Sequence, residues 1–297
     1  MRLLLSGATG YVGRYLLKKL NTDKFQLALL VRKEYREGRP GEFIIDTRQN
    51  NWKEKVRDFD PDTVIHLAAF LTSDDNEKNI DRLIESNISF GAHLLDALKA
   101  TNIKTFINTG TIKEYHLHEG KKIPSGLYAA TKSAFRPIID YYQSLIGFRY
   151  FNIIPYTIYG GVDSEKKMLD LIYESLGATK PIDMSPGEQV MDLIHIDDVV
   201  NFYSTLLLKL PGIKNEISEI HLGYGKGSTP KQIAALIEKI SEEKCNINWG
   251  GRPYRPNDTM YSVVPQDLSG LQIGWQPSVS IDDGIALYIK ERKKHGI

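Results

Sequence analysis

The feature that most constrains this chain is a glycine-rich turn close to its start. Gly7, Gly10 and Gly13 are spaced three residues apart, after an apolar run at residues 3–5 and before a helical pattern at 11–20. Glycine loses more conformational entropy on folding than other residues, so this repetition indicates positions where a Cβ would block a turn or a close approach. In loops of this kind the backbone approaches a pyrophosphate, and the N-terminus of the following helix faces the phosphates. The order strand, glycine turn, helix therefore predicts dinucleotide binding rather than a plain turn.

Apolar runs and helical patterns alternate through the first half of the sequence. The expected strands cover residues 3–5, 26–31, 43–45, 63–67, 105–108 and 151–158, and the expected helices cover 11–20, 52–59, 79–100 and 127–145. This alternation is typical of a parallel sheet with helices on both faces. The predicted fold class is therefore α/β, a doubly wound parallel sheet of the Rossmann type with a smaller C-terminal lobe.

The regular alternation ends after residue 160, where Gly/Pro-rich connections begin to separate the helical patterns. This change predicts a boundary between two parts of the chain. We expect residues 1–160 to form the dinucleotide-binding domain, with segments near 192–225 returning to it. Residues 161–191 and 226–297 are expected to form the substrate-binding lobe.

Composition argues against several classes of protein. Thirty-eight Lys and Arg against 37 Asp and Glu leave a formal net charge of +1, which favours neither a nucleic-acid surface nor an acidic membrane surface. The single cysteine, Cys245, cannot form an internal disulfide, and no apolar run approaches the roughly 20 residues of a membrane span. Met1 leads almost directly into a strand, without a signal-peptide pattern. We therefore expect a cytoplasmic protein.

No metal site is predicted from the sequence. His116 and His118 alternate after the fifth expected strand, but no cysteine or carboxylate spacing completes a ligand set around them. A loop that borders the substrate is the preferred interpretation of this segment.

The end of the second expected strand indicates which dinucleotide is bound. An acidic residue there would hold the ribose 2′-hydroxyl of NAD, whereas an arginine accommodates the 2′-phosphate of NADP. Arg32 and Lys33 stand at this position, and Arg14 follows the third glycine of the turn. The charge of these side chains favours NADPH over NADH as the cofactor.

Tyr128 and Lys132 are the predicted catalytic pair, four residues apart and so on one face of a helix. Tyr15 and Lys19 share this spacing, but only Tyr128 begins the helix after the fifth strand, at the sheet edge where ligands of such folds bind. A phenol has a pKa of about 10, and a neighbouring ammonium would lower that pKa toward a value useful for proton transfer. Thr111, at the end of the fifth strand, is predicted to donate its hydroxyl to a substrate carbonyl.

These motifs together resemble those of the extended short-chain dehydrogenase/reductase family, in its nucleotide-sugar branch, over nearly the whole chain. The matching segments are residues 7–13, 66–69, 155–160, 187–199 and 252–256, with the single positions Asp46, Asn87, Tyr128 and Lys132. The resemblance implies a nicotinamide cofactor, a nucleoside-diphosphate sugar as substrate, and a homodimer packed through the two long helices.

The resemblance, together with the basic pair at the second strand, defines the expected binding residues. Cofactor contacts are expected from Gly7, Thr9, Gly10, Tyr11, Val12, Gly13, Arg32, Lys33, Asp46, Ala68, Asn87, Tyr128, Lys132 and Pro155. Substrate contacts are expected from Thr111, Thr157, Gln189 and Arg255. Within these sets, the resemblance implies that Asp46 holds the adenine and that Arg255 holds the diphosphate.

Some positions depart from the family pattern. The 4,6-dehydratases that this chain resembles carry an Asp-Glu pair directly after their threonine, whereas Ile112 and Lys113 follow Thr111 here. Neither side chain can exchange the proton that loss of water requires, so a dehydratase is rejected. Thr157 replaces a frequent asparagine and Met191 a frequent arginine, changes that bear on the contacts with sugar or phosphate.

Three functions remain open. Residues 184–189 and the short interval between Thr111 and Tyr128 resemble the CDP-abequose and CDP-paratose synthases, which are 4-ketoreductases. This favours NADPH-dependent reduction of the 4-keto group of a CDP-linked deoxysugar, for the synthesis of surface-polysaccharide sugars. The alternatives are a nucleotide-sugar epimerase that keeps its NAD(P) bound and a non-catalytic NADP-binding scaffold. The intact set of hydroxyl, phenol and ammonium argues against the scaffold, because a protein that only binds the cofactor does not need it.

Overall fold

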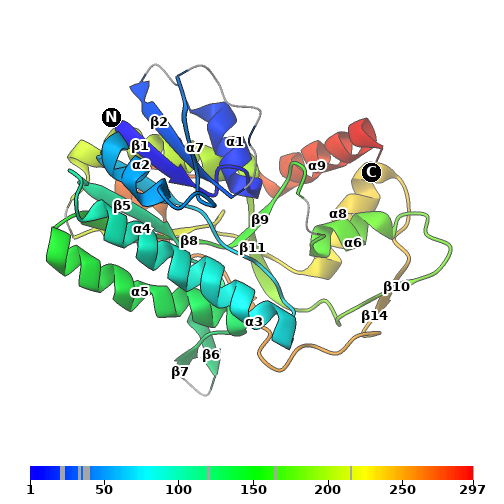
Figure 1. The fold of residues 1–297 in the computed structure, drawn as a ribbon. Helices are drawn as coiled ribbons and strands as arrows, with labels where there is room; N and C mark the ends of the chain where they lie inside the picture. The colour runs from blue at the N-terminus through cyan, green and yellow to red at the C-terminus, as the bar shows by residue number, and fades with distance from the viewer. Residues whose placement is uncertain are drawn as a thin grey trace. The chain divides into compact units, whose positions relative to one another are not determined.

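Two compact units make up the chain (Figure 1). The computed structural model describes residues 1–20, 24–32, 35, 41–118, 121–163, 166–214 and 216–296. Unit 1 comprises Met1–Ile154 with Leu206–Ile220, and unit 2 comprises Pro155–Thr205 with His221–Ile297.

A seven-stranded sheet forms the centre of unit 1, apart from the last residues of two strands that belong to unit 2. Its strands are β1 (Arg2–Ser6), β2 (Gln26–Val31), β3 (Phe43–Asp46), β4 (Thr63–His66), β5 (Thr105–Thr109), β8 (Arg149–Pro155) and β12 (Glu219–Leu222), in the order β12-β8-β5-β4-β1-β2-β3. Every pairing from β3 across to β8 is parallel. The order reverses between β1 and β4, the point at which dinucleotides bind in such sheets. The predicted doubly wound α/β fold is confirmed.

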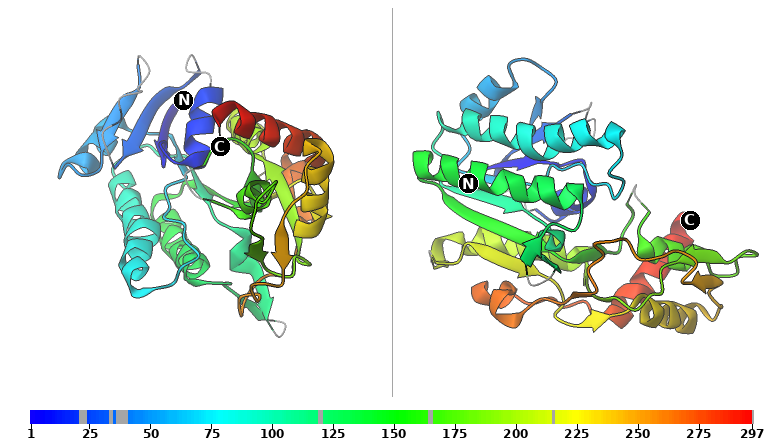
Figure 2. Two further views of the ribbon diagram at one scale, coloured as in Figure 1. Left: turned by 90° about the vertical axis from the view of Figure 1, so that its right-hand side faces the viewer. Right: turned by 90° about the horizontal axis from the view of Figure 1, so that it is seen from below.

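Helices cover this sheet, and α4 and α5 lie side by side along it (Figure 2). The helices of unit 1 are α1 (Tyr11–Lys19), α2 (Trp52–Phe59), α3 (Glu77–Ile84), α4 (Phe90–Leu98) and α5 (Leu127–Ile146). Fully buried Leu94, Phe106 and Phe135 form part of the core between α4, α5 and the strands. Within the described residues, no helix is both long and apolar enough to cross a membrane.

The long helix expected at 79–100 is interrupted. It consists of α3 and α4, joined by a π-helical turn, η2 (Glu85–Ser89). Such turns are frequent at functional sites because they change the direction in which a side chain points. In this case the turn contains two buried polar residues, Ser86 and Asn87.

Short elements between β5 and α5 differ from the loop that the sequence predicts. A 3₁₀ helix, η3 (Ile112–Tyr115), leads into an antiparallel hairpin of β6 (His116–His118) and β7 (Lys121–Ile123). Strands of three residues are too short to show a clear alternation of apolar and polar side chains.

Unit 2 contains smaller sheets and its own core. β11 (Val190–His195) pairs with β9 (Thr157–Tyr159), β13 (Gly227–Ser228) and β15 (Tyr261–Ser262), while β10 (Ile182–Met184) pairs with β14 (Ile247–Trp249). The helices are α6 (Met168–Glu174), α7 (Ile196–Lys209), α8 (Pro230–Ser241) and α9 (Ile281–His295), and the 3₁₀ turns are η4 (Leu210–Gly212), η5 (Gln266–Leu268) and η6 (Gly270–Ile273). The last residues of α7, Leu206–Lys209, belong to unit 1. Buried Ile172, Ile237 and Ile285 pack in one cluster that joins α6, α8 and α9.

The observed division of the chain differs in detail from the one expected at residue 160. β8 is the last strand of the first segment of unit 1, and the chain passes into unit 2 at Pro155. Among the segments expected to return, β12 joins the main sheet, whereas β11 pairs with β9 inside unit 2. Both strands are short and apolar, so the sequence pattern does not distinguish their pairing partners.

Candidate active site

Two of the three glycines in the turn after β1 are required by packing within the protein. Gly7 has a φ of +73°, and a Cβ on it would lie 2.6 Å from the backbone nitrogen of Ala68, which follows β4. A Cβ on Gly13 would lie 2.2 Å from the carbonyl oxygen of Gly7. These two glycines therefore allow the turn to pack against β4 and allow α1 to start directly behind the turn.

Gly10 differs from the other two glycines, because it is exposed. A Cβ on it would contact only the carbonyl oxygen of Gly7, at 3.2 Å, so packing alone does not demand glycine here. Gly10 is the N-cap of α1, no side chain caps this helix, and its first turn contains no acidic residue. Thr9, Tyr11 and Val12 lie half-buried beside it. An uncapped helix N-terminus behind a glycine that a ligand can approach fits the pyrophosphate of a dinucleotide.

A hydrogen-bonded chain connects this turn to the end of β4. The hydroxyl of Ser6, the residue before Gly7, lies 2.7 Å from Nδ1 of His66 and accepts from the backbone N–H of Ala68 at 3.3 Å. Burial lowers the pKa of His66 to about 3, so its ring is neutral. The predicted cofactor residue Ala68 is thus held beside the turn by Ser6.

The basic side chain expected to bind the 2′-phosphate lies at the end of β2. Arg32 is exposed, and its Nη1 donates to Oγ of Ser86, in the π-helical turn, at 3.0 Å. Within the described residues, no carboxylate forms an ion pair with Arg32. Arg14 is exposed on α1, and Lys33 lies outside the described residues. A guanidinium anchored at the strand end without a carboxylate partner fits a phosphate group.

Asp46, expected to hold the adenine, already has a partner. At the end of β3, its carboxylate accepts two hydrogen bonds from Arg48, Nε to Oδ1 at 2.9 Å and Nη2 to Oδ2 at 2.6 Å. These bonds lower the pKa of Asp46 to about 2. The carboxylate is therefore ionised at neutral pH, and part of its hydrogen-bonding capacity is taken by Arg48.

Asn87 bridges two elements of the site. Its side chain accepts from the backbone N–H of Phe70 at 2.7 Å and donates to the Phe70 carbonyl at 3.1 Å and to Oγ1 of Thr131 at 3.0 Å. Thr131 in turn donates to the carbonyl of Tyr128 at 2.8 Å. Both N–H donors of Asn87 are therefore used within the protein, and the side chain fixes the segment after β4 against α5.

Lys132 is a buried ammonium on the second turn of α5. Only 3% of the residue is exposed, and burial lowers its pKa to about 8. Within the described part of the chain, no hydrogen bond or ion pair reaches its Nζ. A buried cation without a protein partner is unfavourable by itself, and its presence is explained when a ligand supplies the missing oxygen atoms.

Tyr128, the second residue of α5, keeps its proton at neutral pH. Burial raises the pKa of its phenol, and the Glu114 carboxylate acts in the same direction. The expectation that Lys132 lowers this pKa is therefore wrong for the protein without cofactor, because the loss of hydration outweighs the ammonium. No described residue hydrogen-bonds to the phenol.

Thr111 presents a hydroxyl in a fixed orientation. As the N-cap of η3, it accepts at Oγ1 from the backbone N–H of Lys113 at 3.4 Å, while its own backbone N–H donates to Oε1 of Glu114 at 2.8 Å. Thr111 is 9% exposed, and within the described residues nothing accepts its hydroxyl proton. That proton can therefore be donated to a substrate oxygen.

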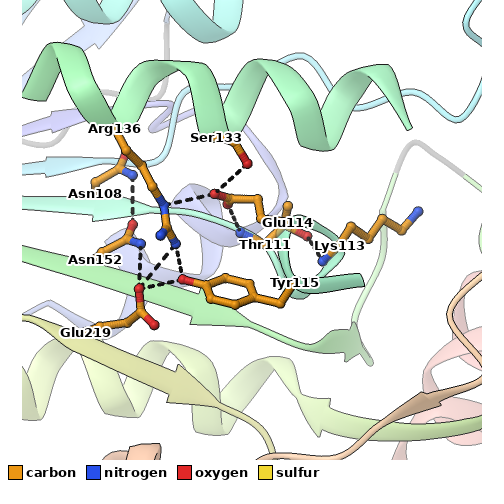
Figure 3. Close-up of polar contacts among 9 residues, drawn as sticks. All are labelled: Asn108, Thr111, Lys113, Glu114, Tyr115, Ser133, Arg136, Asn152 and Glu219. Carbon is orange, nitrogen blue, oxygen red and sulfur yellow. Dashed lines mark hydrogen bonds and ion pairs between the residues drawn. The ribbon is translucent and has the colours of Figure 1, made fainter. Parts of the chain in front are cut away.

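A network of charged and polar side chains that the sequence analysis missed lies beneath this site (Figure 3). Glu114 forms an ion pair with Nε of Arg136 at 2.9 Å, and Arg136 reaches Glu219 on β12, with Nη2 to Oε2 at 3.3 Å. Tyr115 donates to Glu219 at 2.5 Å and is also hydrogen-bonded by Arg136. The signal in the sequence is weak, because a Glu in a polar loop usually lies in solvent. Its partners stand far along the chain.

The remaining predicted residues belong to unit 2. Pro155 ends β8, and half-buried Thr157 on β9 pairs in register with Leu193 on β11. Gln189 is half-buried, and its Oε1 is buried without a hydrogen-bond partner in the described part of the chain. Arg255 is exposed, with its backbone N–H bonded to Oδ2 of Asp258 at 3.0 Å. Within this unit, Gln189 and Arg255 can offer polar groups to a ligand.

No cluster of three His, Cys, Asp or Glu side chains in the described ranges is arranged to hold a metal ion.

Known proteins share both sequence and fold with this chain. The CDP-abequose synthase of Yersinia pseudotuberculosis is 28% identical over 274 residues, which cover 88% of this chain and 91% of that protein. The UDP-glucuronate 4-epimerase of Thermodesulfobacterium geofontis is 25% identical over 78% of this chain and 72% of that protein. A solved structure of UDP-glucuronic acid 4-epimerase from Bacillus cereus, in complex with UDP-glucuronic acid and NAD, has the same fold. Its TM-score is 0.86 at 21% identity, covering 99% of this chain and 100% of that one.

A family model gives the assignment. Residues 3–221 match the NAD dependent epimerase/dehydratase family, a span that includes the glycine turn, all seven strands of the main sheet except the end of β12, and the helix bearing Tyr128 and Lys132. The resemblance inferred from the sequence motifs is confirmed, and the chain belongs to the NAD dependent epimerase/dehydratase family.

Proposed function

We propose that this protein is an NADPH-dependent reductase that converts the 4-keto group of a nucleotide-linked deoxysugar, CDP-linked in our proposal, into a hydroxyl. The observation that carries the proposal is the phenol of Tyr128, which is kept protonated by burial and has no protein partner among the described residues. A ketone that accepts a hydride becomes an alkoxide and needs a proton donor at that oxygen. A protonated phenol is the form that this step requires.

Each residue of the set has a separate task in this reaction. The reduced nicotinamide, when bound, supplies the hydride. Thr111 donates its hydroxyl proton in a hydrogen bond to the ketone oxygen, and Tyr128 transfers its proton to the same oxygen as negative charge develops there. The Lys132 ammonium binds the ribose hydroxyls of the cofactor and stabilises the phenolate that remains after the transfer.

The protonated state of Tyr128 is also the reason for preferring a reductase to an epimerase. An epimerase begins by removing a proton from a sugar hydroxyl, so its tyrosine must start as phenolate. Burial and the charge of Glu114 both raise the pKa of Tyr128, which opposes that starting state. The epimerase stays the second candidate because proteins named as UDP-sugar 4-epimerases are among the relatives.

The choice of NADPH rests on the end of β2. Arg32 is exposed there, is anchored by Ser86, and has no ion-pair partner among the described carboxylates. An acidic residue at this place would repel a 2′-phosphate, whereas a guanidinium binds it. Solved structures of similar fold carry NAD in their titles, so the preference for NADPH is specific to this chain.

The nucleotide sugar is proposed from the relatives and from unit 2. Three CDP-abequose synthases match 88% or more of this chain, at 23–28% identity. Arg255 carries a charge suited to a diphosphate, and Gln189 has an unpaired carbonyl oxygen suited to a donor on the base or sugar. These groups support a nucleoside-diphosphate sugar as substrate.

The test uses the purified protein with NADPH and a CDP-linked 4-keto-deoxysugar that is generated in the same vessel. Absorbance at the reduced-nicotinamide band and analysis of the sugar are followed together. We expect NADPH to disappear in a one-to-one ratio with the reduced sugar. A changed sugar without loss of NADPH would instead identify an epimerase, and no reaction of either kind would contradict the CDP-linked substrate.

A further inference from the structure

Glu114 is placed to control where Thr111 lies. Its Oε1 accepts from the Thr111 backbone N–H at 2.8 Å, closing a reciprocal cap at the start of η3. Its Oε2 forms the ion pair with Nε of Arg136 at 2.9 Å and accepts from the Ser133 hydroxyl at 3.4 Å. Arg136 and Ser133 stand on α5, within one turn of Lys132 (Figure 3). One carboxylate therefore joins the loop of the hydroxyl donor to the helix of the proton donor.

The far end of this connection is also fixed. Arg136 contacts Glu219 on β12 and Tyr115 at the end of η3, and its guanidinium lies 5.0 Å from the centre of the Tyr115 ring. Tyr115 itself is hydrogen-bonded to Glu219 at 2.5 Å. Both ends of η3 are thus tied to α5, through Glu114 at Thr111 and through Arg136 at Tyr115.

We propose that Glu114 is a positioning residue: it touches neither substrate nor cofactor, and it holds the Thr111 hydroxyl at the place where the proton of Tyr128 is delivered. This inference rests on the role of Thr111 in the proposed function. Reacting groups tolerate little displacement, since an error of about 1 Å can lower a rate by about 10²-fold. The loop of Thr111 needs such a tie because it lies beyond the last residue of β5, outside the sheet.

The charge of Glu114 gives the carboxylate a second link to the same groups. Burial raises the pKa of Glu114, while Arg136, the Thr111 N–H, Lys132 and Ser133 lower it. Replacement by a neutral side chain therefore removes an ion pair as well as the cap. A test must separate the loss of positioning from a general loss of stability.

A double-mutant cycle with Thr111 makes this separation. Glu114→Ala is measured in the natural background and in Thr111→Val, which removes the hydroxyl but keeps the size of the side chain and the backbone N–H. If Glu114 acts through the hydroxyl, Glu114→Ala should lower kcat by about 10–100-fold in the natural background. In the Thr111→Val background the same change should lower kcat by less than about twofold, because nothing is left to position. The Kd for NADPH should stay within about twofold in all variants.

A buried carboxylate in unit 2 provides the matched control. Asp170 also closes a cap, accepting from the Lys167 N–H at 2.7 Å, and it also binds a buried arginine, Arg292, with Tyr288 donating to it at 2.6 Å. Asp170→Ala should change kcat by the same factor whether or not Thr111→Val is present. Any interaction that appears with Glu114 and not with Asp170 therefore reports positioning.

The outcomes are distinct. Equal losses of kcat from Glu114→Ala in both backgrounds would overturn the inference and leave the proposed function intact. An unchanged kcat for Thr111→Val alone would overturn the role of Thr111, and the inference with it. If Glu114→Ala does not fold, the cycle is run with Glu114→Gln, whose amide oxygen can still accept from the Thr111 N–H. That variant should retain most of the activity, and a loss as large as that of Thr111→Val would contradict the positioning role of the cap.

Discussion

At the scale of single residues, the site combines groups that are unfavourable for stability with groups that are suited to proton transfer. Burial keeps Tyr128 protonated and lowers the pKa of Lys132 to about 8, and neither side chain has a hydrogen-bond partner among the described residues. Buried polar groups without partners are rare in proteins and concentrate where a ligand completes them. The two residues therefore point to function more strongly than their spacing in the sequence does.

Tyr128→Phe tests the proton donor. The change removes one hydroxyl and should lower kcat by about 10²–10⁴-fold, because the developing alkoxide loses its acid. The Kd for NADPH, measured by fluorescence titration, should stay nearly unchanged. Tyr141→Phe on the same helix is the control, since that ring is 61% exposed. Full turnover by the Tyr128 variant would remove this residue from the mechanism.

Lys132→Met should make the protein more stable and less active. The pKa of Lys132 in the folded protein is about 8 against a reference of 10.5, so below pH 8 the folded state carries a buried charge that the unfolded state exposes to water. By linkage, removing this group should raise the free energy of unfolding by about 3 kcal/mol at pH 7. The gain should shrink between pH 8 and 10.5, because the folded natural protein releases the proton there before the unfolded one does. Urea unfolding at pH 7 and pH 10 measures both values, and a gain that does not depend on pH would contradict the shifted pKa.

Arg32→Asp tests the choice of cofactor. A carboxylate at the end of β2 would repel a 2′-phosphate and could accept from a ribose 2′-hydroxyl, so kcat/KM should fall far more for NADPH than for NADH. A change of the NADPH-to-NADH ratio by about 10²-fold or more corresponds to the loss of one charge-assisted contact and the gain of a repulsion. Steady-state kinetics with both cofactors gives this ratio. Equal losses for the two cofactors would show that Arg32 does not recognise the phosphate.

At the scale of elements, the sequence pattern predicts the main sheet and its helices because their periods differ clearly. Runs such as 26–31 and 63–66 are continuously apolar, as buried parallel strands require, and 127–145 repeats at helical spacing. The hairpin of β6 and β7 and the π-helical turn could not be predicted in this way, because each involves three to five residues. Their conformations depend on contacts with other parts of the chain.

Glu114 and Asn87 show the same limit within the site. Each acts by joining two elements, Glu114 joining η3 to α5 and Asn87 joining the segment after β4 to α5. Asn87 is found from the family motif but with a binding role, and the structure shows its N–H donors bonded to Phe70 and Thr131. A residue whose partners lie on other elements carries no periodic signal that a single sequence reveals.

Asn87→Ala tests the bridge between these elements. The change leaves the Phe70 backbone and the Thr131 hydroxyl without their partner in a buried region, which should lower the free energy of unfolding by about 1–3 kcal/mol. It should also lower kcat, since Thr131 contacts the carbonyl of Tyr128. Asn76→Ala is the control, because that exposed side chain bonds only within its own turn, to Asp74. Chemical unfolding and steady-state kinetics are the measurements, and equal stability of the two variants would contradict the bridge.

At the scale of the whole molecule, we propose that two chains associate through the long helices of unit 1. Exposed apolar side chains stand on both: Ile80 and Ile84 on α3 are 38% and 45% exposed, and Tyr141 and Leu145 on α5 are 61% and 57% exposed. Their spacing of four residues places each pair on one face of its helix. Soluble proteins rarely leave such faces in water, so a second copy of the same surface is the partner that we expect.

Ile84→Glu should break this association. A carboxylate placed in an apolar interface must lose its hydration without a partner, so the Kd of the dimer should rise by about 10²-fold or more. Sedimentation velocity across a range of protein concentrations measures the shift from dimer to monomer. Leu117→Glu on β6 is the control, because Leu117 is 64% exposed but does not belong to the helices, and the same charge there should leave the dimer intact. A natural protein that sediments as a monomer at all concentrations would overturn the proposed dimer, whereas equal weakening by both variants would show that the contact lies elsewhere.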